Sequence, residues 1–399
     1  MIKLLVGLCA AESDAATLRA AKRLDAAAWQ QLIDLAQLHK CAPWLFERLR
    51  VLDLQAGMPV PAHDRLLTIV QRNAKRNLRR LSDLRELGAL LSSASPVIVL
   101  KGARLMRSHY ADLSLRFMTD TDVMARPEHI DAVSITLQNL GWRRASQRAP
   151  GADEQRHDIS FLRSDMHLEL HRAFLDEGTG FRIDYEGVWR RATRDGTTGL
   201  HIMSLEDQLL HVCLHAAYHH SFNVGLYPLI DVSNICNDPT LNIEVLLRRA
   251  QQWGAERCLL LVLEVTRCLL AAKMPEAINH ACMPIRTHCK GQLSVAKLSV
   301  HFGPVPRESD FSALMMLVDR LSTLDGWRAL PDTFRRRFTR DKAQRSRWPR
   351  TREVGTVAQL RPLVVALAHS IHRPAYWRTA LARVRSARLR PWMESRSTV

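Results

Sequence analysis

The sequence predicts an α+β protein in which helical regions flank a short block of strands and helices. Helical periodicity dominates residues 1–93 and returns over residues 176–330. Between them, at 94–175, short β-branched runs and a two-residue turn are typical of a mixed sheet. A chain of 399 residues has room for two or three domains and buries a core without disulfides.

Composition excludes several classes of protein. Hydrophobic residues make up 47% and charged residues 24%, as in ordinary globular chains, and no apolar run approaches the ~20 residues of a membrane span. Residues 1–11 resemble a weak signal peptide, but we expect them to form a core helix. The eight cysteines lie mostly in apolar helical patterns, as reduced thiols do, so we expect a cytoplasmic protein.

The first region is expected to be helical throughout. Ala26–His39 repeats leucine at helical spacing, and His63–Ser92 is a long amphipathic stretch that follows a Gly/Pro-bearing turn. The apolar positions of that stretch are Leu66, Leu67, Val70, Leu78, Leu81, Leu84, Leu87 and Leu91. Nothing in this region points to chemistry.

The block at 94–175 and the helical region after it are predicted element by element. We expect strands at Pro96–Leu100, Leu115–Arg126, Asp158–Arg163 and Met166–His171, the last two joined by a turn at Ser164-Asp165, and helices at Ala103–Tyr110 and Glu128–Leu140. Further helices are expected at Leu205–Tyr218, Tyr227–Asn237, Ile243–Gly254, Ala255–Ala272 and Phe311–Leu321.

Positive charge is concentrated at the end of the chain. Residues 331–399 contain 17 Lys or Arg against 4 Asp or Glu, a net charge of +13, which leaves +4 for the first 330 residues. Such a segment can contact the phosphates of nucleic acid or an anionic membrane surface. It is equally consistent with a solvated tail that binds nothing.

Three carboxylates form the most informative pattern. Residues i and i+2 of a strand point to the same face, so Asp120 and Asp122 are expected to project together, as are Glu169 and His171 on the last strand. Carboxylates on adjacent strands are able to share Mg²⁺ ions, an arrangement used for in-line displacement at phosphorus. An Asp-x-Asp motif by itself is weak evidence for a metal site. The order in which it occurs among the other motifs strengthens the prediction.

Candidate phosphate-binding groups lie close by in the sequence. Lys101-Gly102 occurs where a strand ends and a helix begins, which would present a point charge and free backbone N–H groups to an anion. Arg116, four residues before Asp120, is a second candidate.

Five separated motifs resemble one family. Val97-Ile-Val-Leu-Lys-Gly-Ala-Arg-Leu105, Arg116 with Asp120-Thr-Asp122, Leu168-Glu-Leu-His171, the helix from Ser204 to His215, and Tyr227-Pro-Leu-Ile-Asp231 are similar to the uncharacterised bacterial nucleotidyltransferase family 5. This family is a branch of the polymerase-β-like superfamily. The resemblance covers roughly residues 1–270 and does not extend to the basic segment.

The resemblance implies a polymerase-β-like palm at 94–175, with Asp120, Asp122 and Glu169 binding Mg²⁺ or Mn²⁺. It implies transfer of a nucleoside monophosphate from an NTP to a hydroxyl acceptor, which can be a small molecule, peptide, protein or RNA. Lys101, Gly102 and Arg116 would bind the nucleotide, although the superfamily's usual Gly-Ser loop is here Lys-Gly-Ala. The alternative is a non-catalytic nucleotide or nucleic-acid binding module.

Histidines mark a second feature of the helical region. His211, His215 and His219 are spaced to share one helical face, a stripe that can bind zinc but more often forms part of a core. His215 and Asp231 match positions of the family. With His171, we expect them to line an acceptor pocket or to tie the helical region to the palm.

Overall fold

The computed structural model describes residues 1–91, 95–145, 157–302 and 389–394. The chain divides into two compact units, Met1–Pro304 with Met393–Val399, and Val305–Trp392. The fold and site described below belong to the first unit. The helix expected at Phe311–Leu321 and most of the basic segment at 331–399 lie outside the described residues, which there form only helix α20 (Leu389–Glu394).

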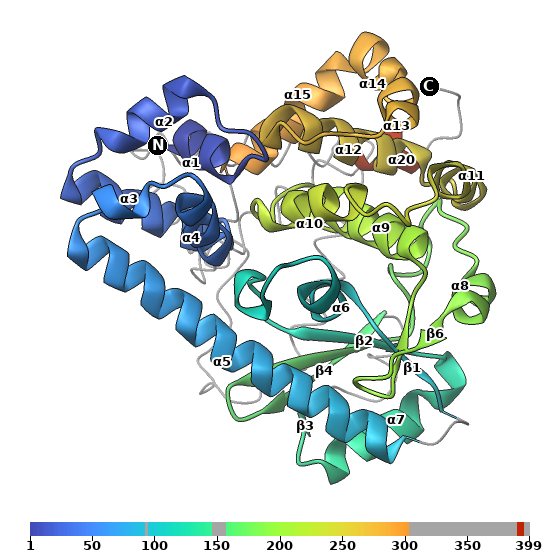
Figure 1. Ribbon diagram of the computed structural model, residues 1–399. Helices are drawn as coiled ribbons and strands as arrows, with labels where there is room; N and C mark the ends of the chain where they lie inside the picture. Colours follow the sequence, from blue (N-terminus) through green and yellow to red (C-terminus); the bar gives the residue numbers. More distant parts are fainter. Residues whose placement is uncertain (92–94, 146–156, 303–388, 395–399) are drawn as a thin grey trace, which may run out of the picture. The chain divides into compact units, whose positions relative to one another are not determined.

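The N-terminal region consists of helices, as expected. They are α1 (Ile2–Cys9), α2 (Ala15–Lys22), α3 (Ala26–Leu38), α4 (Ala42–Val51) and α5 (Val60–Leu90), with a short 3₁₀ turn η1 (Gln55–Gly57) before α5. The carboxylates of Asp14 and Asp25 cap α2 and α3 by accepting hydrogen bonds from backbone N–H groups. Figure 1 shows α5 running from these helices to the sheet.

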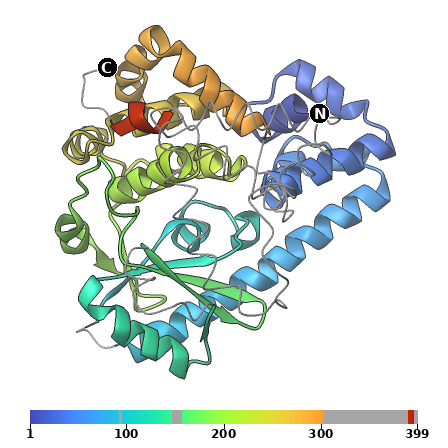
Figure 2. The same ribbon diagram turned by 180° about the vertical axis from the view of Figure 1, so that it is seen from behind.

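A seven-stranded mixed sheet follows, which makes the protein α+β. Its strands are β1 (Val97–Val99), β2 (Thr121–Ala125), β3 (Arg143–Arg144), β4 (Asp158–Arg163), β5 (Met166–His171), β6 (Thr193–Arg194) and β7 (His201–Ile202). They are ordered β3-β4-β5-β2-β1-β7-β6. Figure 2 shows the same ribbon from behind. Strand β2 is central, antiparallel to β1 and parallel to β5.

The sheet differs from the prediction in two respects. The strand expected at Leu115–Arg126 covers only Thr121–Ala125. Leu115 belongs instead to a 3₁₀ turn, η2 (Leu113–Leu115), which Asp112 caps. The two-residue strands β3, β6 and β7 were not expected, since they are too short to show periodicity. The predicted hairpin is confirmed, with Arg163 paired to Met166 across Ser164-Asp165.

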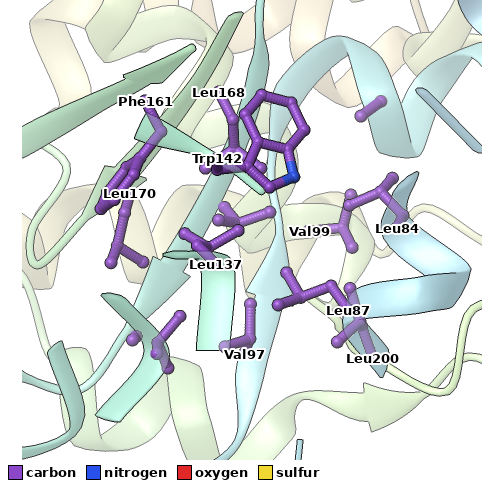
Figure 3. Packing of buried hydrophobic residues seen from close by; sticks show 14 of the residues in the cluster. Leu84, Leu87, Val97, Val99, Leu137, Trp142, Phe161, Leu168, Leu170 and Leu200 are labelled. Carbon is purple, nitrogen blue, oxygen red and sulfur yellow. The ribbon is translucent and has the colours of Figure 1, made fainter. Parts of the chain in front are cut away.

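The main core of the sheet lies on one face (Figure 3). Alternate residues of the central strands point to that face and pack against leucines of α5 and against α7 (Ile130–Asn139), which begins after the turn η3 (Pro127–His129). Members labelled in Figure 3 include Leu84, Leu87, Val97, Val99, Leu137, Trp142, Phe161, Leu168 and Leu170. The intervening residues of β2 and β5 therefore point to the opposite face.

Helix α6 (Lys101–Ser108) and the later helices lie toward that opposite face. These later helices are α8 (Tyr185–Arg191), α9 (Leu205–Cys213), α10 (Tyr227–Cys236), α11 (Ile243–Trp253), α12 (Glu256–Leu270), α13 (Glu276–Ala281), α14 (Met283–His288) and α15 (Lys290–Phe302). The helix expected to continue to Tyr218 changes to a π-helical turn, η4 (Leu214–His219). All eight cysteines are unpaired thiols, seven of them buried. No helix in the described part of the chain is long and apolar enough to span a membrane.

Candidate active site

The register between β2 and β5 sets the positions of the acidic residues. The strands are parallel, and Asp122 pairs with Glu169 while Met124 pairs with His171. Because Glu169 and His171 are two residues apart on β5, they point to the same face as Asp122. Asp120 lies one residue before β2 begins.

Two overlapping sets of side chains come close enough to hold a cation. We call Asp122, Glu169 and His171 the inner group, and Asp120, His167 and Glu169 the outer group. In each group, one ligand atom from every residue lies within 4.8 Å of the others. Carboxylates and imidazoles are ordinary ligands of divalent metals, so the residues present fit a divalent cation. His167 was not expected from the sequence; its two-residue spacing before Glu169 was the available signal.

Two side chains already contact Asp122. Lys101 Nζ donates a hydrogen bond to Asp122 Oδ1 at 2.9 Å, and His171 Nε2 lies 2.9 Å from the same oxygen. The side chains of Asp122 and His171 are 8% and 2% exposed. Burial by itself raises the pKa of Asp122, but the Lys101 ammonium and the hydrogen bond to His171 outweigh it and hold that pKa well below its usual range. Asp122 is therefore a carboxylate at neutral pH.

Asp120 experiences the opposite balance. Burial, and then repulsion from the carboxylates of Asp122 and Glu169, raises the pKa of Asp120. Burial disfavours the charged form of Lys101, but the three carboxylates outweigh this and raise its pKa. The site therefore carries excess negative charge around Asp120, the side on which a cation would be stabilised.

Lys101 also begins helix α6. Its φ is +43°, an uncommon conformation for a residue with a side chain. No side chain caps this helix, so the N–H groups of its first turn have no side-chain acceptor at the N-cap. The buried Gly102 permits a close approach within the protein itself, because a Cβ there would lie 2.8 Å from Met118 Sδ and 3.1 Å from Arg116 Nη2.

Arg116 is occupied elsewhere. Its Nε and Nη2 donate to the two carboxylate oxygens of Asp231 at 2.7 and 2.6 Å, and its guanidinium stacks on the ring of Tyr227. The hydroxyl of Tyr110 donates to the same carboxylate at 2.6 Å. Arg116 and Asp231 are almost completely buried. These contacts do not support the predicted role of Arg116 in binding phosphate, and they link the segment before β2 to α10.

Helix α5 contributes polar groups that were not expected from the sequence. Asn73 and Asn77 are buried and donate to backbone carbonyls of residues 113–116, and Arg80 donates to the carbonyl of Met118. They replace the strand partners that this segment lacks. Leu78, expected among the core positions, is 56% exposed. The available signal was the spacing of Asn73, Asn77 and Arg80, which follows one helical face.

Histidines extend from the site into the helical region. The ring of His157 lies 5.4 Å from that of His171 and 5.1 Å from that of His219, and His215 stacks on His219. Burial, followed by repulsion from Lys101, lowers the pKa of His215 well below its usual value. Within the described residues, no three of these histidines come close enough together to share a metal ion.

A cavity of about 430 Å³ lies at the other end of β2. Its lining includes Pro127, which follows β2, and His157, whose Nδ1 shares a hydrogen bond with Asp176 Oδ1. Asp120 precedes β2, so this cavity does not contain the carboxylate cluster. We assign it no role.

Comparison with known proteins gives one match. A family model described as "uncharacterised nucleotidyltransferase" matches residues 25–271, more than half of the chain. Neither the curated proteins nor the solved structures in the comparison include a match.

Proposed function

The chain belongs to this nucleotidyltransferase family, and on that premise we propose that it transfers a nucleoside monophosphate from an NTP to a hydroxyl acceptor, releasing pyrophosphate. One observation carries the proposal: carboxylates from two neighbouring parallel strands converge beside the uncapped start of α6. Transfer of a phosphoryl-type group needs this combination of cation ligands and anion-binding groups.

The proposed role of each site residue follows from its surroundings. Asp120, Asp122 and Glu169 would hold Mg²⁺ or Mn²⁺, which when bound would stabilise the negative charge on the attacking and leaving oxygens. Lys101 and the N–H groups that begin α6 would bind the triphosphate. Glu169, whose side chain is 25% exposed, would also help to activate the acceptor hydroxyl.

The remaining predicted residues are proposed to support the site. Gly102 allows α6 to pack against Met118, and Arg116 with Asp231 holds the segment that leads to Asp120. His171 orients Asp122 through its hydrogen bond. His215 is proposed to connect the helical region to the site through the histidine rings.

A non-catalytic nucleotide-binding module is the second candidate. It is favoured by the pairing of Asp122 with both Lys101 and His171, which leaves one of the three carboxylates already neutralised. The two candidates differ in pyrophosphate release, which only the enzyme would show.

Thermal unfolding with each of the four NTPs, with and without Mg²⁺ or Mn²⁺, tests nucleotide binding. A ligand at 100 times its dissociation constant adds about 2.7 kcal/mol of stability. We expect a metal-dependent stabilisation by at least one NTP, lost in Asp120→Asn and retained in Asp165→Asn. Asp165 is the matched control, since it lies in the hairpin turn beside β5 and pairs with arginines of α5.

The same proteins are then assayed for pyrophosphate release with pooled hydroxyl compounds, peptides and RNA. Release that requires Asp120 supports the enzyme. Nucleotide binding without release for any acceptor supports the second candidate, and no stabilisation by any NTP rejects both.

A further inference from the structure

The inner and outer groups differ in how far they are already neutralised. In the inner group, one oxygen of Asp122 contacts both Lys101 and His171, and the side chains of Asp122 and His171 are buried. In the outer group, all three side chains are partly exposed. Within the described part of the chain, no side-chain hydrogen bond or ion pair involves Asp120 or His167. The charges of Lys101 and Lys40 act on Asp120 from farther away, and His171 Nε2 lies 3.6 Å from Glu169 Oε2. The outer group is therefore the more exposed of the two, and its Asp120, unlike Asp122, makes no direct ion pair with a described residue.

We propose that the outer group binds the resident cation and that His167 is its third protein ligand. The register of β2 and β5 supports this assignment. Thr121 pairs with Leu168, so Asp120, one residue earlier, lies beside His167. Glu169 follows His167 by two residues on the same face. Their ligand atoms lie within 4.8 Å of one another, near enough for small side-chain movements to bring all three to about 2.1 Å from one ion.

The imidazole determines which ions suit the site. Carboxylates alone suit Mg²⁺ and Mn²⁺ alike, whereas imidazole is a ligand of first-row transition metals and a poor partner for Mg²⁺. Two carboxylates with one imidazole favour Mn²⁺ or a similar transition metal. As long as no triphosphate binds Lys101, its ammonium opposes a second cation at Asp122. Without nucleotide, the protein therefore binds one Mn²⁺.

This inference rests on the proposed function for the need for a cation, but its test does not use activity. The full chain is titrated with Mn²⁺ without nucleotide and followed by electron paramagnetic resonance. One ion per chain is expected, and pulsed spectra should show ¹⁴N coupling from an imidazole. His167→Gln should abolish that coupling and weaken Mn²⁺ binding by about 10-fold or more, with a smaller change for competing Mg²⁺.

Three further samples make the test decisive. His167→Asp should restore cation binding and shift the preference toward Mg²⁺, because it makes the group all-carboxylate. Labelling the wild-type histidines with ¹⁵N should change the nitrogen coupling without any substitution. His171→Gln, the matched control on the same strand, should keep the coupling.

Three results would overturn the inference: two Mn²⁺ bound without nucleotide, no nitrogen coupling in the wild type, or coupling lost in His171→Gln and kept in His167→Gln. The last would place the ion in the inner group. Nitrogen coupling without nucleotide binding or transfer would reject the proposed function and leave the His167 site standing. Nucleotidyl transfer by a protein that shows no such coupling would support the proposed function and reject the His167 site.

Discussion

Asp120 and Asp122 are two residues apart but lie in different electrostatic surroundings. The pKa of Asp122 is lowered because Lys101 and His171 outweigh its burial, whereas burial and the neighbouring carboxylates raise the pKa of Asp120. Charge at Asp122 therefore stabilises the folded state and charge at Asp120 destabilises it. Position in the site, more than residue type, decides what each aspartate contributes.

Replacement by asparagine is expected to destabilise the protein at Asp122 but not at Asp120. Asp122→Asn leaves the ammonium of Lys101 buried without its counter-ion, so the free energy of unfolding should fall by about 3–5 kcal/mol. Asp120→Asn removes a like charge and should leave that free energy unchanged or raise it. Urea unfolding of both variants at pH 7 measures the difference, and an equal loss in both would contradict the assignment.

The loss in free energy of unfolding caused by Asp122→Asn is expected to depend on pH. Because the folded-state pKa is lowered, the contribution of Asp122 is fully present above its unfolded value of about 3.9 and is lost as pH falls toward the folded value. Unfolding curves of wild type and variant should therefore converge as pH falls below about 4. A deficit that is constant between pH 6 and pH 3 would show that Asp122 acts through something other than its charge.

At the scale of elements, side chains of helix α5 hold the segment 113–118 in place. This segment has no strand partner, and the side chains of Asn73, Asn77 and Arg80 bind its carbonyl groups instead. The segment ends just before Asp120. The N-terminal helical region therefore positions the site, although its sequence contains no catalytic motif.

Asn77→Leu is expected to destabilise the protein by about 1–3 kcal/mol, because the carbonyls of Leu113 and Arg116 lose a buried donor. The neighbouring Leu78→Ala is the control. Its side chain is 56% exposed, so it should change stability by less than about 0.5 kcal/mol. Chemical denaturation compares the two; a larger loss in Leu78→Ala would mean that the face of α5 is assigned wrongly.

The pair Arg116–Asp231 joins this segment to α10. Asp231→Ala leaves a buried guanidinium unpaired and is expected to cost about 3–5 kcal/mol. Tyr110→Phe removes one hydrogen bond to the same carboxylate and should cost about 1 kcal/mol. The double variant Arg116→Met/Asp231→Leu should recover much of the loss in a double-mutant cycle. Additive losses would indicate that the two residues act independently.

At the scale of the whole molecule, charge is distributed unevenly. The formal net charge is +17, of which +13 belongs to residues 331–399. An arginine-rich segment attracts polyanions through counter-ion release, without a specific site. Any RNA or DNA binding by the protein is therefore expected to depend on this segment and to weaken steeply with salt.

Replacing Arg335, Arg336 and Arg337 together by Gln is expected to make log affinity for single-stranded RNA less dependent on log salt. The slope should fall by about 0.7 for each phosphate that the variant no longer neutralises. The control replaces Arg72, Arg76 and Arg79, three exposed arginines of α5, by Gln. Fluorescence anisotropy at about 50–200 mM salt measures both slopes. An equal reduction in the control would place the binding surface on the body of the protein.

The sequence by itself determined the fold class and most helices and strands, because these depend on short-range periodicity, and its separated motifs carried the family resemblance. The same-face placement of Glu169 and His171 also follows from alternation along one strand. Only the tertiary structure decided what these residues contact. That Asp122 pairs with Lys101 and His171, that Arg116 binds Asp231, and that His167 lies beside Asp120 depend on strand register and helix docking. These contacts join residues tens of positions apart, where local patterns carry no information.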